Sequence, residues 1–310
     1  MSTPRFRSTI LALAILGSPV AASAQAPALS SGIDIARLYR VVPNITYVTA
    51  NNWEAKLDVY TPRQPAGPVP TVIYIHGGWW ISGSKESSVL SILPYLERGF
   101  AVVNVEYRLA RVSLAPAAVE DCRCALRWVI RNAKEHNFDT SRLVVTGGSA
   151  GGHLSLITGM LTPDAGLDRQ CMGDEKLQVA AIVNWYGVSD VNDVLTGPNV
   201  RGQAELWLGS NPDRDALARR VSPMTYVRAG LPPILTVHGD KDLSVPYSHG
   251  VRLHAALDKV VVPNQLVTIP GGGHGGFDQA QTQRIYSTIF DFLRTHGVMT
   301  AAPTSSAAAR

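Results

Sequence analysis

Hydrophobic positions in this chain fall into short continuous runs separated by longer stretches with helical spacing. The runs at 71–75 (TVIYI) and 101–105 (AVVNV) are rich in β-branched residues and carry no charge. Such runs are typical of strands that are buried on both faces. Strands are predicted at residues 45–48, 56–60, 71–75, 101–105, 143–146, 179–185, 234–237 and 265–269, the first two as an antiparallel pair.

Between these runs, apolar residues recur every three or four positions, a spacing that predicts amphipathic helices. The helices are predicted at residues 87–98, 117–135, 151–161, 251–258 and 279–296. Alternation of strands and helices favours an α/β fold, with a mostly parallel, doubly wound sheet flanked by helices.

The first 24 residues have the three-part layout of a secretory signal. Arg5 and Arg7 precede an apolar run at 10–16, and Ala22-Ser23-Ala24 offers a cleavage site. An uncleaved amphipathic start is the alternative. The run is too short to span a membrane, so we expect a secreted or periplasmic protein without membrane contact after cleavage. The predicted organisation is a signal peptide at 1–24, a single domain at 25–298 and a disordered tail at 299–310.

Composition narrows the classes of protein further. The chain is 45% hydrophobic with a net charge of +4, and Arg5 and Arg7 account for half of that charge. High hydrophobicity with low net charge excludes an intrinsically disordered chain. A charge this small gives no reason to expect a nucleic-acid partner.

Export would permit a disulfide bond, and the chain has three cysteines. Cys122 and Cys124 are two residues apart on a predicted helix, so their side chains point in nearly opposite directions. Because the apolar stripe of that helix includes Cys122, we expect Cys124 to be the partner of Cys171. Three reduced thiols are the alternative, and the spacing matches no zinc site.

The strongest chemical signal is the pentapeptide Gly147-Gly148-Ser149-Ala150-Gly151. It follows a predicted strand and precedes a predicted helix, as the nucleophile-elbow motif requires. The turn is so tight that side chains two residues before and after the serine would collide. Ser149 is therefore the candidate nucleophile.

A second motif, His76-Gly77-Gly78-Trp79-Trp80, follows the strand at 71–75. Rigid backbone N–H groups can stabilise the negative charge that builds up on a carbonyl oxygen during acyl transfer. The predicted oxyanion-hole residues are Gly78, Trp79 and Ala150, with Gly77 as an alternative donor. His76 is expected to hold the loop by hydrogen bonds rather than to take part in the reaction.

A serine nucleophile needs a base that is oriented by an acid. Asp240 and Asp242 both follow the strand at 234–237, and Asp242, further along the loop, is the predicted acid. Asp240 is expected to cap the turn. His274, in the glycine-rich segment after the strand at 265–269, is the predicted base. This chemistry needs no metal and no cofactor.

These motifs, in this order, resemble the α/β-hydrolase superfamily. The resemblance extends over most of residues 40–296 and includes LDVY at 57–60, EYRL at 106–109 and HGDKDLSVP at 238–246. The HGGWW loop favours the HGGxW branch, which includes hormone-sensitive-lipase-like carboxylesterases, feruloyl and acetyl-xylan esterases and kynurenine formamidases. In this resemblance, Ser149, Asp242 and His274 match the catalytic triad.

The resemblance implies a secreted serine ester hydrolase that acts on short-acyl, acetyl or feruloyl esters, either small molecules or esters linked to a polysaccharide. An arylformamidase, a serine peptidase of the same fold and a non-catalytic binding protein are the alternatives. Residues 186–233 could form a modest lid, and no large cap is expected. The candidate substrate-binding residues are Trp79, Trp80, Trp185 and Trp207, with Tyr186 as a further aromatic candidate, although core packing is the competing interpretation. Acyl specificity and oligomeric state are left open.

Overall fold

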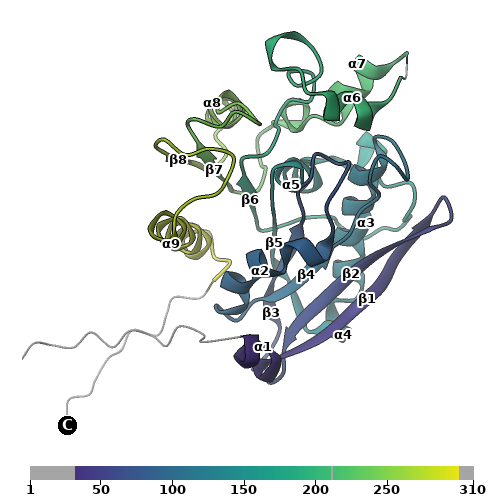
Figure 1. The fold of residues 1–310 in the computed structure, drawn as a ribbon. Coiled ribbons are helices and arrows are strands. Elements are labelled where there is room, and N and C mark those ends of the chain that lie inside the picture. Colours follow the sequence, from purple (N-terminus) through teal and green to yellow (C-terminus); the bar gives the residue numbers. More distant parts are fainter. Residues whose placement is uncertain (1–31, 211, 300–310) are drawn as a thin grey trace, which may run out of the picture.

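The computed structural model describes residues 32–210 and 212–299 of the chain. A single sheet runs through it, with the strand order β1-β2-β4-β3-β5-β6-β7-β8 (Figure 1). The predicted signal peptide at 1–24 and the predicted tail, apart from Met299, lie outside the described residues. The strands are β1 (Tyr39–Ala50), β2 (Trp53–Pro62), β3 (Val69–Ile75), β4 (Ala101–Val105), β5 (Phe138–Gly148), β6 (Ala181–Trp185), β7 (Ile234–Gly239) and β8 (Asn264–Ile269).

The sheet is the α/β-hydrolase fold that the sequence predicts. β1 pairs antiparallel with β2, and β2 pairs antiparallel with β4, whereas the pairings from β4 to β8 are parallel. Ile75 at the end of β3 pairs with Gly147 near the end of β5. This register makes the loop from His76 and the turn at Ser149 leave the sheet side by side.

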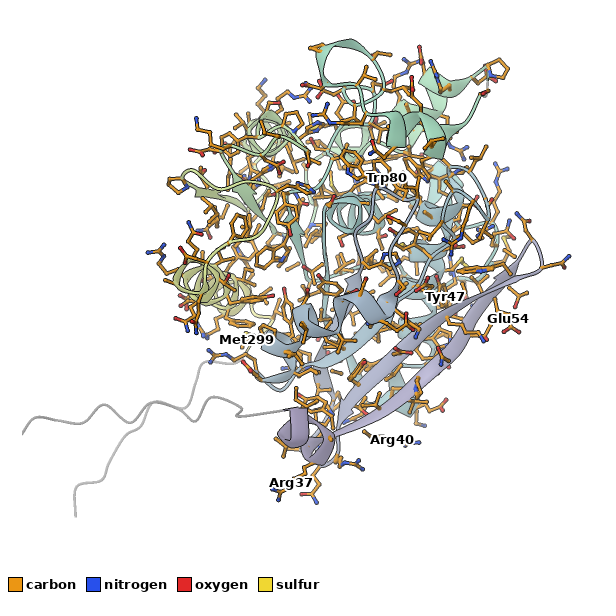
Figure 2. All side chains as sticks on the ribbon, in the orientation of Figure 1. Arg37, Arg40, Tyr47, Glu54, Trp80 and Met299 are labelled. Atoms are coloured by element: carbon orange, nitrogen blue, oxygen red, sulfur yellow. A yellow bond between two sulfur atoms is a disulfide. The ribbon has the colours of Figure 1, made fainter. Side chains whose placement is uncertain are left out.

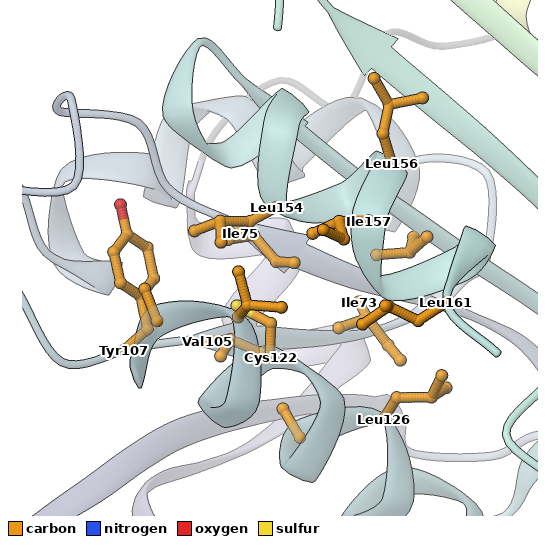
Figure 3. Packing of buried hydrophobic residues seen from close by; sticks show 14 of the residues in the cluster. Ile73, Ile75, Val105, Tyr107, Cys122, Leu126, Leu154, Leu156, Ile157 and Leu161 are labelled. Carbon is orange, nitrogen blue, oxygen red and sulfur yellow. The ribbon is translucent and has the colours of Figure 1, made fainter. Parts of the chain in front are cut away.

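Successive side chains of β3 point to opposite faces of the sheet, as strand geometry requires. Ile73 and Ile75 belong to one buried cluster, which they share with residues of α3 (Ala117–Arg131) and α5 (Ala150–Met160), as Figure 3 shows. Val72 and Tyr74 face the other cluster, with residues of α2 (Val89–Leu96) and α9 (Gln279–Thr295). Helices therefore cover both faces. The side chains of the whole chain are drawn in Figure 2.

The predicted helix at 117–135 is interrupted at Asn132. There the backbone leaves the helical region, with φ −99° and ψ 13°, and the Asn132 side-chain amide donates to the carbonyl oxygen of Trp128. The chain continues as the short helix α4 (Ala133–His136). The predicted helix at 87–98 also divides, into the 3₁₀ turn η1 (Lys85–Ser88) and α2.

The predicted disulfide is confirmed. Cys124 on α3 is bonded to Cys171 in the loop after α5, with their Cα atoms 5.6 Å apart. Cys122 is a free, fully buried thiol, as the helical stripe predicts.

The segment between β6 and β7 crosses the upper part of the molecule in Figure 1. It contains α6 (Gly202–Leu208) and α7 (Arg214–Arg220), together with the 3₁₀ turns η3 (Gly197–Asn199) and η4 (Pro223–Tyr226). The remaining elements are α1 (Gly32–Leu38), α8 (Ser248–Lys259) and the turn η2 (Pro163–Ala165). None of the helices in the described ranges is both long and apolar enough to cross a membrane.

Candidate active site

Ser149 occupies a sharp turn between β5 and α5. Its backbone is left-handed, with φ 58° and ψ −119°, and its N–H donates to the carbonyl oxygen of Trp185 at 2.9 Å. A Cβ atom on Gly147 or on Gly151 would lie within 2.1 Å of the carbonyl oxygen of Ile75. The two glycines are therefore required by the close contact between the turn and β3.

The structure brings Ser149, His274 and Asp242 into one chain of hydrogen bonds. Nδ1 of His274 lies 2.7 Å from Oδ2 of Asp242, and Nε2 of His274 lies 2.8 Å from Oγ of Ser149. A carboxylate only accepts hydrogen bonds, so Nδ1 carries the proton and Nε2 accepts from the serine hydroxyl. The imidazole is thus oriented to take a proton from Ser149.

The Asp242 carboxylate is buried, and four groups surround it. Oδ1 accepts hydrogen bonds from the backbone N–H groups of Ser244 and Val245, at 2.8 and 3.0 Å. Oδ2 lies 2.7 Å from His274 Nδ1 and 3.3 Å from His238 Nε2. Burial would raise the pKa of Asp242, but the hydrogen bonds from the two histidines and Val245 hold that pKa well below its ordinary value. Asp242 is therefore ionised at neutral pH.

The loops that carry the acid and the histidine are joined by their backbones. Lys241 N–H donates to the carbonyl oxygen of Gly272 at 2.9 Å, and Asp240 N–H donates to that of Ile269 at 3.2 Å. The Asp240 carboxylate accepts in turn from Gly271 N–H at 2.7 Å. Asp240 thus fixes the turn, as expected, and links it to the loop that carries His274.

The four predicted oxyanion-hole residues all lie beside Ser149. Gly77 is so close to the turn that a Cβ on it would lie 2.8 Å from the carbonyl oxygen of Gly148. Gly78 and Trp79 follow with positive φ angles of 114° and 53°. Ala150 is the first residue of α5, where backbone N–H groups lack helical partners and favour negative charge.

His76 holds the loop from within. It is 2% exposed, its ring stacks on Tyr107 with centroids 4.2 Å apart, and Nδ1 bonds to the carbonyl oxygen of Gly77 at 2.7 Å. Burial lowers the pKa of His76 to about 4, so the ring is neutral at pH 7. These contacts agree with the structural role expected for this residue.

A cleft of about 350 Å³ opens above Ser149. His274, Gly77, Gly78 and Trp79 line it, together with residues that the sequence analysis did not assign to the site. Three of these are serines from η1 and α2, whose spacing carries no signal in the sequence. The newly assigned lining residues are Tyr74, Ser87, Ser88 and Ser91, and Tyr186, His76 and Gly148 also line the cleft.

Tyr186, one of the aromatic candidates from the sequence, lines the cleft. Its ring centroid lies 4.7 Å from that of His274, and its backbone has a positive φ of 41°. A Cβ on Gly275 would lie 3.0 Å from the Tyr186 hydroxyl. Tyr186 therefore packs against the histidine loop and borders the space in front of Ser149.

The expectation that Trp80 and Trp207 contact substrate is wrong. Both side chains are fully buried, and their rings stack on each other with centroids 4.3 Å apart. Trp80 Nε1 also donates to Nδ1 of the buried His153 at 3.0 Å. Of the four predicted tryptophans, Trp79 lines the cleft, and Trp185 packs beside Tyr286.

Among the described side chains, no group of three or more His, Cys, Asp or Glu residues is arranged to hold a metal ion. The hydrogen-bond chain and the loop beside Ser149 supply the parts of a serine hydrolase: a nucleophile, a base, an acid and candidate oxyanion donors.

Comparison with known proteins points the same way. The BD-FAE family model matches residues 57–257, and the model described as TAP-like protein matches residues 216–302. The esterases LipC and LipQ of Mycobacterium tuberculosis are each 28% identical, over 71% and 74% of this chain. The chain spans about half the length of these curated relatives, 56% in both cases.

Similar solved structures are matched over nearly their whole length, unlike the curated relatives. A truncated form of a carbohydrate esterase from gut microbiota superposes with a TM-score of 0.72 and 27% identity, covering 83% of this chain and 97% of the other. The propionate-bound esterase Est2 of Thermogutta terrifontis has a TM-score of 0.70 and 27% identity, covering 86% and 97%.

Proposed function

This chain belongs to the BD-FAE family of α/β-hydrolase esterases, and from that premise we propose that it hydrolyses carboxylic esters through an acyl-enzyme on Ser149. The observation that carries the proposal is the hydrogen-bond chain from Ser149 Oγ through His274 to Asp242.

In the first half of the reaction, Ser149 Oγ attacks the ester carbonyl carbon while His274 Nε2 accepts the hydroxyl proton. The Asp242 carboxylate holds Nδ1–H and stabilises the imidazolium that forms. Backbone N–H groups of Gly78, Trp79 and Ala150, or of Gly77, stabilise the oxyanion. The intermediate then collapses as His274 returns its proton to the departing alcohol oxygen.

In the second half, water attacks the acyl-enzyme. His274 accepts a proton from the water, the carbonyl again passes through an oxyanion, and the Ser149 ester bond breaks. The proton on His274 returns to Ser149 Oγ, which restores the enzyme and releases the carboxylic acid.

The proposed substrates are short-acyl, acetyl or feruloyl esters, including esters of carbohydrates. A cleft of about 350 Å³ is at the small end of the range for ligand sites. Hydroxyl groups of Ser87, Ser88 and Ser91 border it, and such groups suit the polar alcohol portion of a sugar ester. Propionate- and butyrate-bound Est2 and the gut carbohydrate esterase support a short acyl group and a carbohydrate alcohol, respectively.

The proposed location is the periplasm or the cell exterior. The signal-like segment at 1–24 supports this location, and so does the Cys124–Cys171 disulfide, because such bonds persist in oxidising compartments. Expression of the full chain in a bacterium with an export pathway tests it. The mass of the periplasmic protein should correspond to a start near Gln25, whereas a full-length cytoplasmic product would contradict the proposal.

The activity is tested with p-nitrophenyl acetate, p-nitrophenyl butyrate, longer p-nitrophenyl esters, methyl ferulate, acetylated xylan and N-formylkynurenine. Hydrolysis of at least one ester, lost in Ser149→Ala, is the expected result. Preference for N-formylkynurenine would favour an arylformamidase, and inactivity on every ester would overturn the proposal. Labelling by a fluorophosphonate separates an active serine from a non-catalytic binding protein.

A further inference from the structure

A second cavity, of about 720 Å³, lies at the far end of α5 from Ser149. Its walls come from the C-terminal half of α3, the last turn of α5 and the loop that carries Cys171. None of the residues that line it also lines the Ser149 cleft. It is therefore a separate space, with a volume typical of a site for a small organic molecule.

The guanidinium group of Arg123 forms part of this cavity and is buried almost completely, since the residue is 3% exposed. Within residues 32–210 and 212–299, its one hydrogen bond goes from Nη1 to the carbonyl oxygen of Thr158, at 2.8 Å. An arginine has five N–H donors, and in the described part of the chain Arg123 has no ion-pair partner. A buried cation without a counter-ion is unfavourable.

The neighbouring charges do not supply that counter-ion. Asp168 acts on Arg123 electrostatically, but its carboxylate is bonded to Nη2 of Arg127 at 2.7 Å. Glu175 is bonded to Nη1 of Arg127 and to Arg131. Arg228, whose Nη1 donates to the carbonyl oxygens of Met160 and Tyr226, adds another cation to the lining.

The pKa of Arg123 is lowered to about 10, mainly by burial; the positive charges of Arg127 and Arg228 add to this shift, and the negative charge of Asp168 opposes it. The group is still charged at neutral pH. This end of the cavity therefore has a positive potential and free donors, which is the environment that a carboxylate requires.

The rest of the lining is mixed. Leu161, Leu177, Val179 and Pro232 form an apolar wall, and Asp174, Lys176 and Gln178 line the cavity with the carboxylates of Asp168 and Glu175. The loop that closes it is anchored to α3 by the Cys124–Cys171 disulfide, directly next to Arg123 in the sequence. We propose that this cavity binds a small organic carboxylate, with its anionic end on Arg123 and its hydrocarbon part against the apolar wall.

Isothermal titration calorimetry of the full chain with hexanoate tests this proposal. Hexanamide serves as the neutral analogue and inorganic phosphate as the anion without a hydrocarbon part. We compare the natural protein with Arg123→Gln, and with Arg142→Gln as a matched control, since Arg142 is paired to Asp139 on another surface. The melting transition of each variant without ligand establishes that it is folded. Any binding in the Ser149 cleft is common to all three proteins and cancels in the comparison.

Hexanoate should bind the natural protein and Arg142→Gln with equal affinity. Its affinity for Arg123→Gln should be lower by a factor of about thirty or more. Hexanamide and phosphate should both bind more weakly than hexanoate. Equal hexanoate affinity in Arg123→Gln, equal affinity for either analogue, or no measurable binding would each overturn the proposal. Because the readout is binding heat, the result does not depend on ester hydrolysis.

Discussion

Gly151 packs against Ile75 so closely that a Cβ atom on Gly151 would lie 2.0 Å from the Ile75 carbonyl oxygen. The obstacle is backbone, which cannot rotate away as a side chain could. We expect Gly151→Ala to lower the free energy of unfolding by about 1–3 kcal/mol and to reduce activity, because the turn at Ser149 must shift. Urea denaturation measures the first effect and p-nitrophenyl ester hydrolysis the second.

Gly202→Ala is the matched control for that substitution. Gly202 is the first residue of α6, and a Cβ there would meet nothing within 4 Å. The variant should be neutral or more stable by up to about 1 kcal/mol. Equal stability of Gly151→Ala and Gly202→Ala would contradict the prediction, because it would mean that the backbone near Ile75 can move to accept a methyl group at little cost in free energy.

Ser149 and His274 should act as one unit in catalysis. Either Ser149→Ala or His274→Ala should reduce kcat by several orders of magnitude, on the order of 10⁶ in a comparable triad. The double variant should be no worse than either single variant, since each removes the same proton transfer. Steady-state kinetics on p-nitrophenyl butyrate measure this, and multiplicative losses would contradict a shared step.

Asp242 should make the stability of the protein depend on pH in a defined range. Its pKa is lower in the folded chain than the unfolded value of about 3.9. The ionised carboxylate therefore stabilises the fold above that pH, and this contribution is lost as the pH falls towards the folded pKa. The difference in unfolding free energy between the natural protein and Asp242→Asn should shrink from about pH 5 to pH 2. A difference that stays constant in urea titrations across that range would refute the prediction.

The tryptophans should separate into a structural and a functional class. Trp207→Ala removes a fully buried ring that stacks on Trp80, so we expect a loss of about 3–5 kcal/mol in unfolding free energy. Trp79→Ala should cost less stability and should instead lower kcat/KM, because Trp79 lines the cleft. Chemical denaturation and ester kinetics on both variants check this division, and the reverse pattern would contradict it.

The Cys124–Cys171 bond closes a loop with a sequence separation of 47 residues. The chain-entropy model gives such a loop about 4 kcal/mol of stabilisation. The variant with both Cys124→Ala and Cys171→Ala should melt at a lower temperature by a corresponding amount. Dithiothreitol should lower the melting temperature of the natural protein and leave that of the double variant unchanged; equal effects on both would be inconsistent with a stabilising bond.

The centres of the strands could be predicted because burial on both faces leaves a continuous apolar run, as at residues 71–75. The ends could not, since β1 begins at Tyr39, where its burial pattern does not alternate regularly. Likewise, apolar spacing continues through Asn132, but the backbone and the side chain there end α3.

The proximity of Ser149, Asp242 and His274 follows from motifs that each end a strand of one parallel sheet. The burial of the tryptophans was harder to predict, because Trp80 and Trp207 stack only when α6 folds over the loop after β3. Ser87, Ser88 and Ser91 carry no pattern in the sequence. They border the cleft because η1 and α2 pack against β4, the strand that pairs with β3.

The hydrogen bonds between the Asp240–Asp242 turn and the Gly271–Gly272 segment have a consequence for how this chemistry can be altered. The loops that carry Asp242 and His274 are held together by their own hydrogen bonds, whereas Ser149 is held separately, at the end of β5. The atom at position 149 is therefore exchangeable without dismantling the proton acceptor. A thiol installed there by Ser149→Cys would face an imidazole that is already oriented, so this scaffold is preadapted to conversion into a cysteine hydrolase.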